Sequence, residues 1–222
     1  MKKLFLHSGF NQGKTQIDDE FFKLFSNKKP KIGFIPSQSD IERKFFKEIY
    51  LNWYKQFGID DLFYFDIDKE YDETKLDELL SCDAIFLSGG NSYYFLNSLQ
   101  KHNFLPILKK FVEDGGILIG ASAGSILMSK TISIVTIDEN IGGDQNDIGL
   151  KDFSALDLND FEFFPHFDKN DQEIIKRMKE YSLNNNSIIY ACNDGGGIIV
   201  DDDKIKYIGE VFKIENGKIE ML

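Results

Sequence analysis

The order of apolar segments along the chain restricts its fold more than any other feature. Short runs rich in β-branched and aromatic residues alternate with stretches whose apolar residues recur every three to four positions. Such alternation is typical of a parallel sheet with helices on both faces. The sequence therefore predicts an α/β fold. Its strands are expected at residues 3–7, 31–35, 61–65, 84–87, 117–119 and 187–191.

The clearest predicted helix lies between the second and third strands. Its apolar residues follow the helical period, and Gly58 comes where a helix end favours a positive φ. These apolar residues are Ile41, Phe45, Phe46, Ile49, Trp53 and Phe57. Further helices are expected near residues 92–100, 106–114 and 172–181. After Val200, turn-forming residues separate short β runs, which indicates antiparallel hairpins at the end of the fold.

Length and charge narrow the class of protein. A chain of 222 residues can bury a full core, and its 21 phenylalanines exclude a disordered chain, so we expect a single domain over residues 1–222. Lys and Arg number 26 against 37 Asp and Glu, and the net charge of −11 disfavours nucleic acid and anionic membrane surfaces as partners. With no apolar run long enough for a membrane span or a signal peptide, we expect a cytoplasmic protein. Cys82 and Cys192 have no paired spacing and are expected to be buried thiols, without metal or cofactor.

Residues 117–125, Ile-Leu-Ile-Gly-Ala-Ser-Ala-Gly-Ser, contain the pattern G-x-S-x-G directly after an apolar strand. In a nucleophile elbow, small flanking residues let the chain turn sharply from strand to helix and hold the serine hydroxyl exposed in a strained conformation. Ser122 is the serine of this pattern. The pattern alone also fits a glycine-rich turn whose serine has no catalytic role. The other residues of a catalytic site are therefore needed to support Ser122 as a nucleophile.

A serine nucleophile requires a base whose pKa is near neutrality, and histidine is the usual one. The chain has three histidines. His7 ends the first strand, and His102 lies in a lysine-flanked stretch. His166 lies in residues 163–168, Phe-Phe-Pro-His-Phe-Asp, where the aromatic neighbours indicate a sheltered site. We predict His166 as the base.

An acid must orient that imidazole, and 37 acidic residues are too many for one to be selected by count. Asp194 follows the strand predicted at 187–191 and is well placed. Asp138, soon after residues 132–135, is the alternative. We prefer Asp194.

The oxyanion of an acyl-transfer reaction needs backbone N–H donors. Residues 86–92, Phe-Leu-Ser-Gly-Gly-Asn-Ser, end a predicted strand in a glycine pair that allows close approach of a substrate. The amides of Gly90 and Ala123 are the natural pair of donors. Alternatively, the glycines form only a tight turn, with Asn91 or Ser92 capping the next helix.

Four segments taken together resemble the peptidase E family of serine peptidases, which includes aspartyl dipeptidases and cyanophycinases. They are Leu-Ser-Gly-Gly-Asn at 87–91, Gly-Ala-Ser-Ala-Gly-Ser at 120–125, Thr-Ile-Asp at 136–138 and Pro-His-Phe at 165–167. The resemblance implies a three-layer α/β/α sandwich similar to class I glutamine amidotransferases, with serine in place of their cysteine. It also implies Ser122 as nucleophile, His166 as base, and Gly89 with Gly90 in the oxyanion hole. The family's acid follows the histidine, which favours Asp194, although an aspartate resembling Asp138 has also been given that role.

The resemblance implies a small peptide as substrate, including dipeptides with N-terminal Asp. We expect a monomer or homodimer. Recognition of an acidic residue requires a cation, ideally a bidentate arginine. The chain has only Arg43 and Arg177, and Arg177 lies on the predicted helix after the base. We expect substrate contacts from Asn91, Asp138 and Arg177. Residues 168–172 lack the basic residues of the aspartyl dipeptidases, and Lys169 or Lys176 are other candidate cations.

Three other interpretations are compatible with parts of the sequence. An esterase of the α/β-hydrolase type also uses G-x-S-x-G and would take Asp138 as its acid. A non-catalytic binding module could keep the same fold. Residues 9–15, Gly-Phe-Asn-Gln-Gly-Lys-Thr, resemble a phosphate-binding loop but are one residue too short for that motif.

Overall fold

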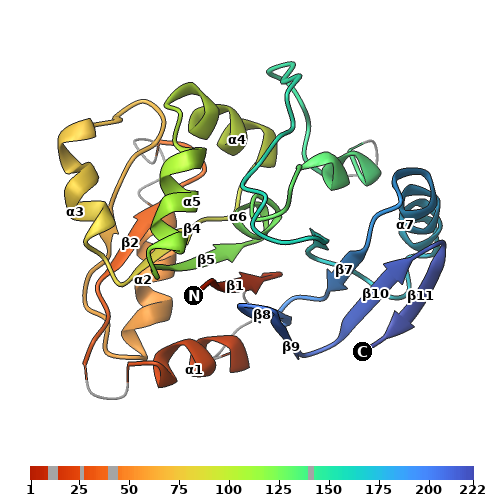
Figure 1. Ribbon diagram of the computed structural model, residues 1–222, viewed down its shortest axis with the longest axis horizontal. Helices are drawn as coiled ribbons and strands as arrows, with labels where there is room; N and C mark the ends of the chain where they lie inside the picture. The colour runs from red at the N-terminus through yellow and green to blue at the C-terminus, as the bar shows by residue number, and fades with distance from the viewer. Residues whose placement is uncertain (10–14, 26–27, 40–44, 140–142) are drawn as a thin grey trace.

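A seven-stranded sheet lies at the centre of the chain, which we describe from a computed structural model over residues 1–9, 15–25, 28–39, 45–139 and 143–222 (Figure 1). The strand order is β3-β2-β4-β5-β1-β8-β9. These strands are β1 (Lys3–His7), β2 (Ile32–Ile35), β3 (Phe63–Tyr64), β4 (Ala84–Leu87), β5 (Ile117–Ala121), β8 (Gly197–Asp201) and β9 (Lys204–Ile208). The five strands from β3 to β1 run parallel, and β8 and β9 are antiparallel to their neighbours. The predicted, mostly parallel sheet is confirmed, although β3 is shorter than expected.

Helices cover both faces of this sheet, because alternate residues of a strand point to opposite sides. On β1, Phe5 joins an apolar cluster with α1 (Gln16–Lys23) and α2 (Phe45–Lys55). Leu4 and Leu6 join another cluster with α3 (Leu76–Leu80), α4 (Ser92–Lys101) and α5 (Leu105–Glu113). The expected three-layer α/β/α arrangement is therefore present. No helix within the described ranges is long and apolar enough to cross a membrane.

The helix predicted between the second and third strands is α2. It begins at Phe45, and Ile41 of the predicted apolar stripe lies outside the described residues. Gly58, just beyond its end, has the expected positive φ of 80°. The helices predicted near 92–100 and 106–114 are α4 and α5, each within one residue of the expected start.

A second sheet of four strands lies beside the central one, in the order β11-β10-β7-β6. Its strands are β6 (Glu162–Phe164), β7 (Ile189–Cys192), β10 (Val211–Glu215) and β11 (Lys218–Met221), and α7 (Gln172–Asn185) packs against β10. The strand expected at 187–191 lies here instead of in the large sheet, since β7 pairs with β6 and β10. The predicted hairpins after Val200 are confirmed as β8-β9 and β10-β11.

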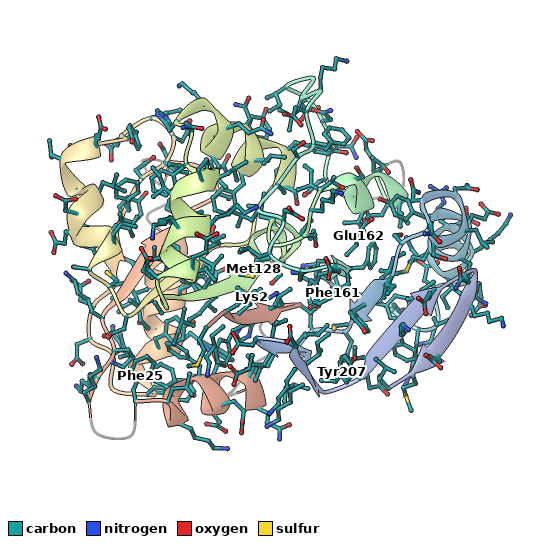
Figure 2. The ribbon with its side chains drawn as sticks, viewed as in Figure 1. Lys2, Phe25, Met128, Phe161, Glu162 and Tyr207 are labelled. Atoms are coloured by element: carbon teal, nitrogen blue, oxygen red, sulfur yellow. The ribbon has the colours of Figure 1, made fainter. Side chains whose placement is uncertain are left out.

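Aromatic side chains join the two sheets. The Tyr190 ring of β7 contacts Phe161 edge-on at 4.8 Å and lies 5.4 Å from the Tyr207 ring of β9. The hydroxyl groups of Tyr190 and Tyr207 are 3.1 Å apart. Figure 2 shows Phe161 and Tyr207 in the region between the sheets. These contacts matter for the site because its parts come from both sheets.

The strand ends bring distant segments of the chain together. β4, β5 and β1 are adjacent and parallel, so the segments that follow them meet at one edge, where α/β proteins usually bind ligands. The segment after β7 reaches the same edge, since the Ser8 amide donates to the Gly196 carbonyl (3.1 Å) and the Gly195 amide to the Gly9 carbonyl (2.9 Å).

Candidate active site

Ser122 lies in the turn between β5 and α6 (Ala123–Ile126) and has φ 51° and ψ −114°. This conformation is costly for a residue other than glycine and is typical of a nucleophile elbow. The flanking glycines are needed for packing: a Cβ at Gly124 would lie 2.2 Å from the Leu87 carbonyl oxygen, and one at Gly120 would lie 2.5 Å from the Gly124 carbonyl carbon. The G-x-S-x-G pattern therefore has a steric cause in this fold.

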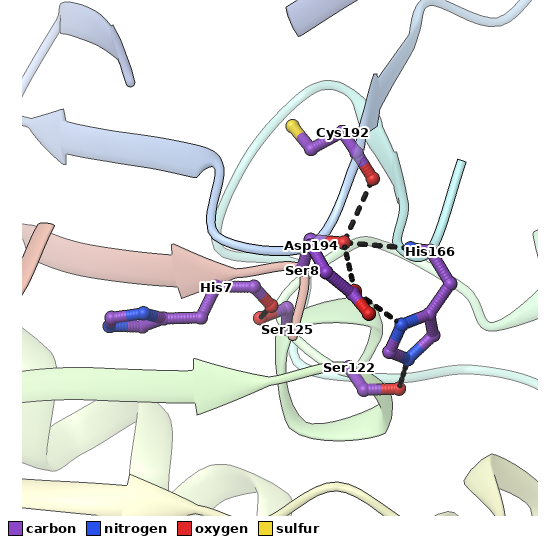
Figure 3. Close-up of polar contacts among 7 residues, drawn as sticks. All are labelled: His7, Ser8, Ser122, Ser125, His166, Cys192 and Asp194. Carbon is purple, nitrogen blue, oxygen red and sulfur yellow. Dashed lines mark hydrogen bonds and ion pairs between the residues drawn. The ribbon is translucent and has the colours of Figure 1, made fainter. Parts of the chain in front are cut away.

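A row of hydrogen bonds runs from Ser122 through His166 to Asp194 (Figure 3). The Ser122 Oγ lies 2.8 Å from His166 Nε2, and His166 Nδ1 lies 2.6 Å from Asp194 Oδ1. A carboxylate at Nδ1 keeps the proton on that nitrogen, which leaves Nε2 facing the hydroxyl as an acceptor. The structure thus brings together three residues that were selected from the sequence, with Asp194 rather than Asp138 on the imidazole.

The other two histidines lie elsewhere. His7 is fully buried, with Nε2 3.9 Å from Asp18 Oδ1, and the ring of His102 stacks on Tyr71 at 3.9 Å. Burial lowers the pKa of both His7 and His102. The two cysteines are free, buried thiols as expected, and burial raises the pKa of Cys82 to about 11.

Ser8 was not selected from the sequence, yet it contacts His166 directly. Its buried Oγ accepts a hydrogen bond from the His166 amide (2.7 Å), donates to the Cys192 carbonyl (2.8 Å) and lies 3.4 Å from Asp194 Oδ1. The signal that could have identified it is positional: Ser8 follows β1, which neighbours the strand that leads into Ser122.

Gly9 leaves room for the histidine and aspartate pair. A Cβ at this position would lie 2.4 Å from Asp194 Oδ1 and 2.9 Å from His166 Cε1. Gly9 begins the segment that resembled a phosphate-binding loop. Residues 10–14 of that segment lie outside the described residues.

The predicted oxyanion donors differ in their availability. The Gly89 amide donates to the Tyr50 hydroxyl at 3.2 Å and is therefore already used. Within the described part of the chain, neither the Gly90 nor the Ala123 amide has a hydrogen-bond acceptor. Gly90 also lines the cleft that contains Ser122. The pair that remains available is Gly90 with Ala123.

Ser122 and His166 open onto a cleft of about 590 Å³. One part of its wall is apolar, formed by Ile126, Ile134, Val135, Phe164 and Ile174. Another part is acidic, formed by Asp138, Asp144 and Asp171, and none of the described residues that line the cleft is Lys or Arg. Burial raises the pKa of Asp138, and the neighbouring Asp144 charge acts in the same direction, while His166 opposes it. No three His, Cys, Asp or Glu residues in the described ranges are arranged to hold a metal ion.

Two of the three expected substrate contacts are engaged elsewhere. Arg177 lines a separate pocket, where its guanidinium binds Glu173 (2.8 Å) and the Ile137 carbonyl (3.1 Å). Asn91 caps α4 by accepting from the Tyr94 amide (3.1 Å), and it donates to the Gln145 carbonyl (2.9 Å). Only Asp138 of the three lines the cleft. The Arg177 side chain lies on the side of α7 that faces residues 136–137.

The other candidate cations also lie outside the cleft. Lys169 forms an ion pair with Glu210 at 2.7 Å, and Lys176 lines the same pocket as Arg177. Arg43 lies outside the described residues.

The sequence model of peptidase family S51 matches residues 4–208. An uncharacterized peptidase of Pasteurella multocida is 33% identical over 171 residues, which cover 75% of this chain and 78% of that protein. A peptidase E of Shewanella denitrificans is 27% identical over 134 residues, covering 57% of this chain and 54% of that protein. The crystal structure of a peptidase from an acI-B1 Actinobacterium superposes with a TM-score of 0.72 at 16% identity, covering 100% of this chain and 94% of that one. This structural likeness concerns the fold.

Proposed function

Because this chain belongs to peptidase family S51 and is a serine-type peptidase, we propose that it hydrolyses small peptides with Ser122 as nucleophile, His166 as base and Asp194 as acid. The observation that carries the proposal is the hydrogen-bonded row from the Ser122 hydroxyl to the Asp194 carboxylate, which opens onto the cleft. Family membership argues against the esterase of the α/β-hydrolase type and against the non-catalytic module.

The first half of the reaction forms an acyl-enzyme. Ser122 Oγ attacks the peptide carbonyl carbon while its proton passes to His166 Nε2. The carbonyl oxygen becomes an oxyanion that accepts hydrogen bonds from the Gly90 and Ala123 amides. As the C–N bond breaks, the imidazolium gives its proton to the departing amine, and an ester with Ser122 remains.

The second half releases the acid. Water attacks the ester carbonyl and passes a proton to His166 Nε2, and the C–Oγ bond then breaks as that proton returns to Ser122. The Asp194 carboxylate stabilises the imidazolium in both halves. Asp138 does not serve as the acid in this proposal, because Asp194 already occupies Nδ1 at 2.6 Å.

The negative charge of the cleft favours peptides that have a free α-amino group and a first residue without an acidic side chain. A protonated α-amine entering the cleft would meet Asp138 and Asp144, neither of which forms an ion pair within the described residues. An N-terminal Asp would add a negative charge among these carboxylates, and Arg177 is held away from them. We therefore propose an apolar or basic first residue, and the expected preference for N-terminal Asp lacks support from the cleft.

The test combines a variant with a panel of dipeptides. Ser122→Ala is expected to reduce hydrolysis of Leu-Ala by at least about 10⁴-fold and to abolish labelling by a fluorophosphonate, because both need the hydroxyl. In the parent enzyme, kcat/KM is expected to be higher for Leu-Ala and Lys-Ala than for Asp-Ala. Full activity of Ser122→Ala would refute the catalytic proposal, whereas preferred cleavage of Asp-Ala would refute only the substrate assignment.

A further inference from the structure

The catalytic row is assembled from two sheets. Ser122 directly follows β5 of the large sheet, and its amide donates to the His7 carbonyl at 3.0 Å. His166 and Asp194 follow β6 and β7 of the second sheet. The hydrogen bond between Ser122 and His166 therefore depends on how the two sheets are joined at this point.

The end of β1 contacts both halves. The His7 carbonyl accepts from the Ser122 amide (3.0 Å) and from the Ser125 hydroxyl (2.8 Å). The next residue, Ser8, binds the His166 amide and the Cys192 carbonyl of the other half (Figure 3). Ser8 itself has no exposed surface. We propose that Ser8 is a positioning residue, which sets His166 and Asp194 in line with the Ser122 hydroxyl. This inference rests on the proposed function of these three residues.

The bond to the His166 amide matters because of the backbone conformation there. His166 has φ 56°, in the left-handed region that costs a non-glycine residue free energy unless its surroundings hold it. The direction in which the imidazole leaves the backbone depends on this angle. The Ser8 oxygen accepts from the His166 N–H at 2.7 Å and so fixes the angle from which the ring reaches Ser122.

The single proton of the Ser8 hydroxyl has one good acceptor. The Cys192 carbonyl lies at 2.8 Å, whereas Asp194 Oδ1 at 3.4 Å is too distant for a strong bond. Donation to Cys192 fixes the end of β7, two residues before Asp194. The Ser8 hydroxyl therefore acts on His166 through its amide and on Asp194 through the backbone of nearby Cys192. It does so without contacting the substrate.

Ser182 provides a matched control. Its hydroxyl is equally buried, accepts from the Gly217 amide (3.0 Å) and donates to the Lys179 carbonyl (2.9 Å), in α7 and outside the cleft. In either alanine variant one amide and one carbonyl lose the hydroxyl that binds them, so the two variants should lose similar stability. Only Ser8→Ala is expected to affect catalysis.

The experiment measures dipeptide hydrolysis and thermal unfolding for Ser8→Ala, Ser8→Thr and Ser182→Ala. For Ser8→Ala we expect kcat to fall by about 10- to 100-fold with KM within about twofold, because positioning is lost while the cleft is kept. We also expect the acidic limb of its kcat/KM profile to move to lower pH, because a misaligned Asp194 stabilises the imidazolium less. Ser8→Thr, which keeps a hydroxyl, is expected to recover most of kcat.

The inference is overturned if Ser8→Ala and Ser182→Ala have the same kcat and the same pH profile at equal melting temperatures. If Ser8→Ala fails to fold, Gly9→Ala gives the answer, since its Cβ must displace Asp194 or His166 and should lower kcat in the same manner. Unchanged kcat in a folded Gly9→Ala variant would also overturn the inference. Loss of activity in Ser122→Ala alongside an unaffected Ser8→Ala would leave the proposed function intact.

Discussion

At the scale of single residues, two aspartates compete for the role of triad acid, and replacing each by asparagine separates them. Asp194→Asn should lower kcat by about 10³- to 10⁴-fold, because an amide at His166 Nδ1 favours the wrong tautomer. Asp138→Asn should lower kcat/KM for free dipeptides mainly through KM and leave the rate of fluorophosphonate labelling unchanged. Kinetics and labelling on both variants provide the measurement, and a larger labelling defect in Asp138→Asn would reverse the assignment.

The residues selected from the sequence were those whose chemistry is tied to a local pattern. Ser122 lies in a motif with steric requirements on both sides, and His166 was the one histidine in an aromatic segment next to a proline. Ser8 carries no such pattern, because its importance comes from the pairing of β1 with β5 and from the close approach of β7. Arg177 shows a similar limit of sequence reasoning. It comes only eleven residues after His166, but the face of α7 on which it lies directs its side chain toward Glu173 and the Ile137 carbonyl.

At the scale of elements, β6 and α7 are joined by a partly buried carboxylate, that of Glu162. The Tyr181 hydroxyl donates to Glu162, at 3.2 Å from Oε1 and 2.9 Å from Oε2. Burial raises the pKa of Glu162 to about 6, and the hydrogen bond from Tyr181 only partly opposes this effect. The folded state thus takes up a proton at higher pH than the unfolded chain does.

This shift predicts how stability depends on pH. The pKa of Glu162 is higher in the folded state than in the unfolded chain. Protonation of Glu162 therefore stabilises the folded state as the pH falls from about 6 toward the pKa of the unfolded chain, and this stabilisation is lost above pH 6. Glu162→Gln should therefore raise the free energy of unfolding at pH 8 by about 1–2 kcal/mol and flatten its change between pH 4.5 and 6. Denaturant unfolding at pH 5 and pH 8 tests this, with the exposed Glu180→Gln as control. A lower stability of Glu162→Gln at pH 8 would contradict it.

The elements found from the sequence were those with a strong hydrophobic period. β4 has its predicted bounds, and α4 is within one residue of them, because a buried strand and an amphipathic helix each have a clear pattern. β6 has only three residues and was not expected. The assignment of β7 to a second sheet could not be read from its sequence, because a buried strand has the same composition in either sheet.

At the scale of the whole molecule, the acidic balance of the surface continues into the cleft. The net charge is −11, and the carboxylates of Asp138, Asp144 and Asp171 line the space beside Ser122. A field of one sign focused in a cleft raises the local concentration of ligands of the opposite sign, and salt weakens this effect. The sign of the charge on the first residue of a peptide should therefore decide how its hydrolysis responds to ionic strength.

Three dipeptides with the same second residue test this response. Between about 10 and 300 mM NaCl, over which the screening length shortens from about 30 Å to less than 10 Å, kcat/KM should fall severalfold for Lys-Ala, change little for Leu-Ala and rise for Asp-Ala. Asp144→Asn should reduce the slope for Lys-Ala, because it removes a carboxylate of the cleft wall. Asp147→Asn, which changes an exposed residue of the same segment, should keep it. Identical salt responses of the three peptides would show that the field of the protein does not contribute to selection, and the preference would then have to arise from the apolar wall alone.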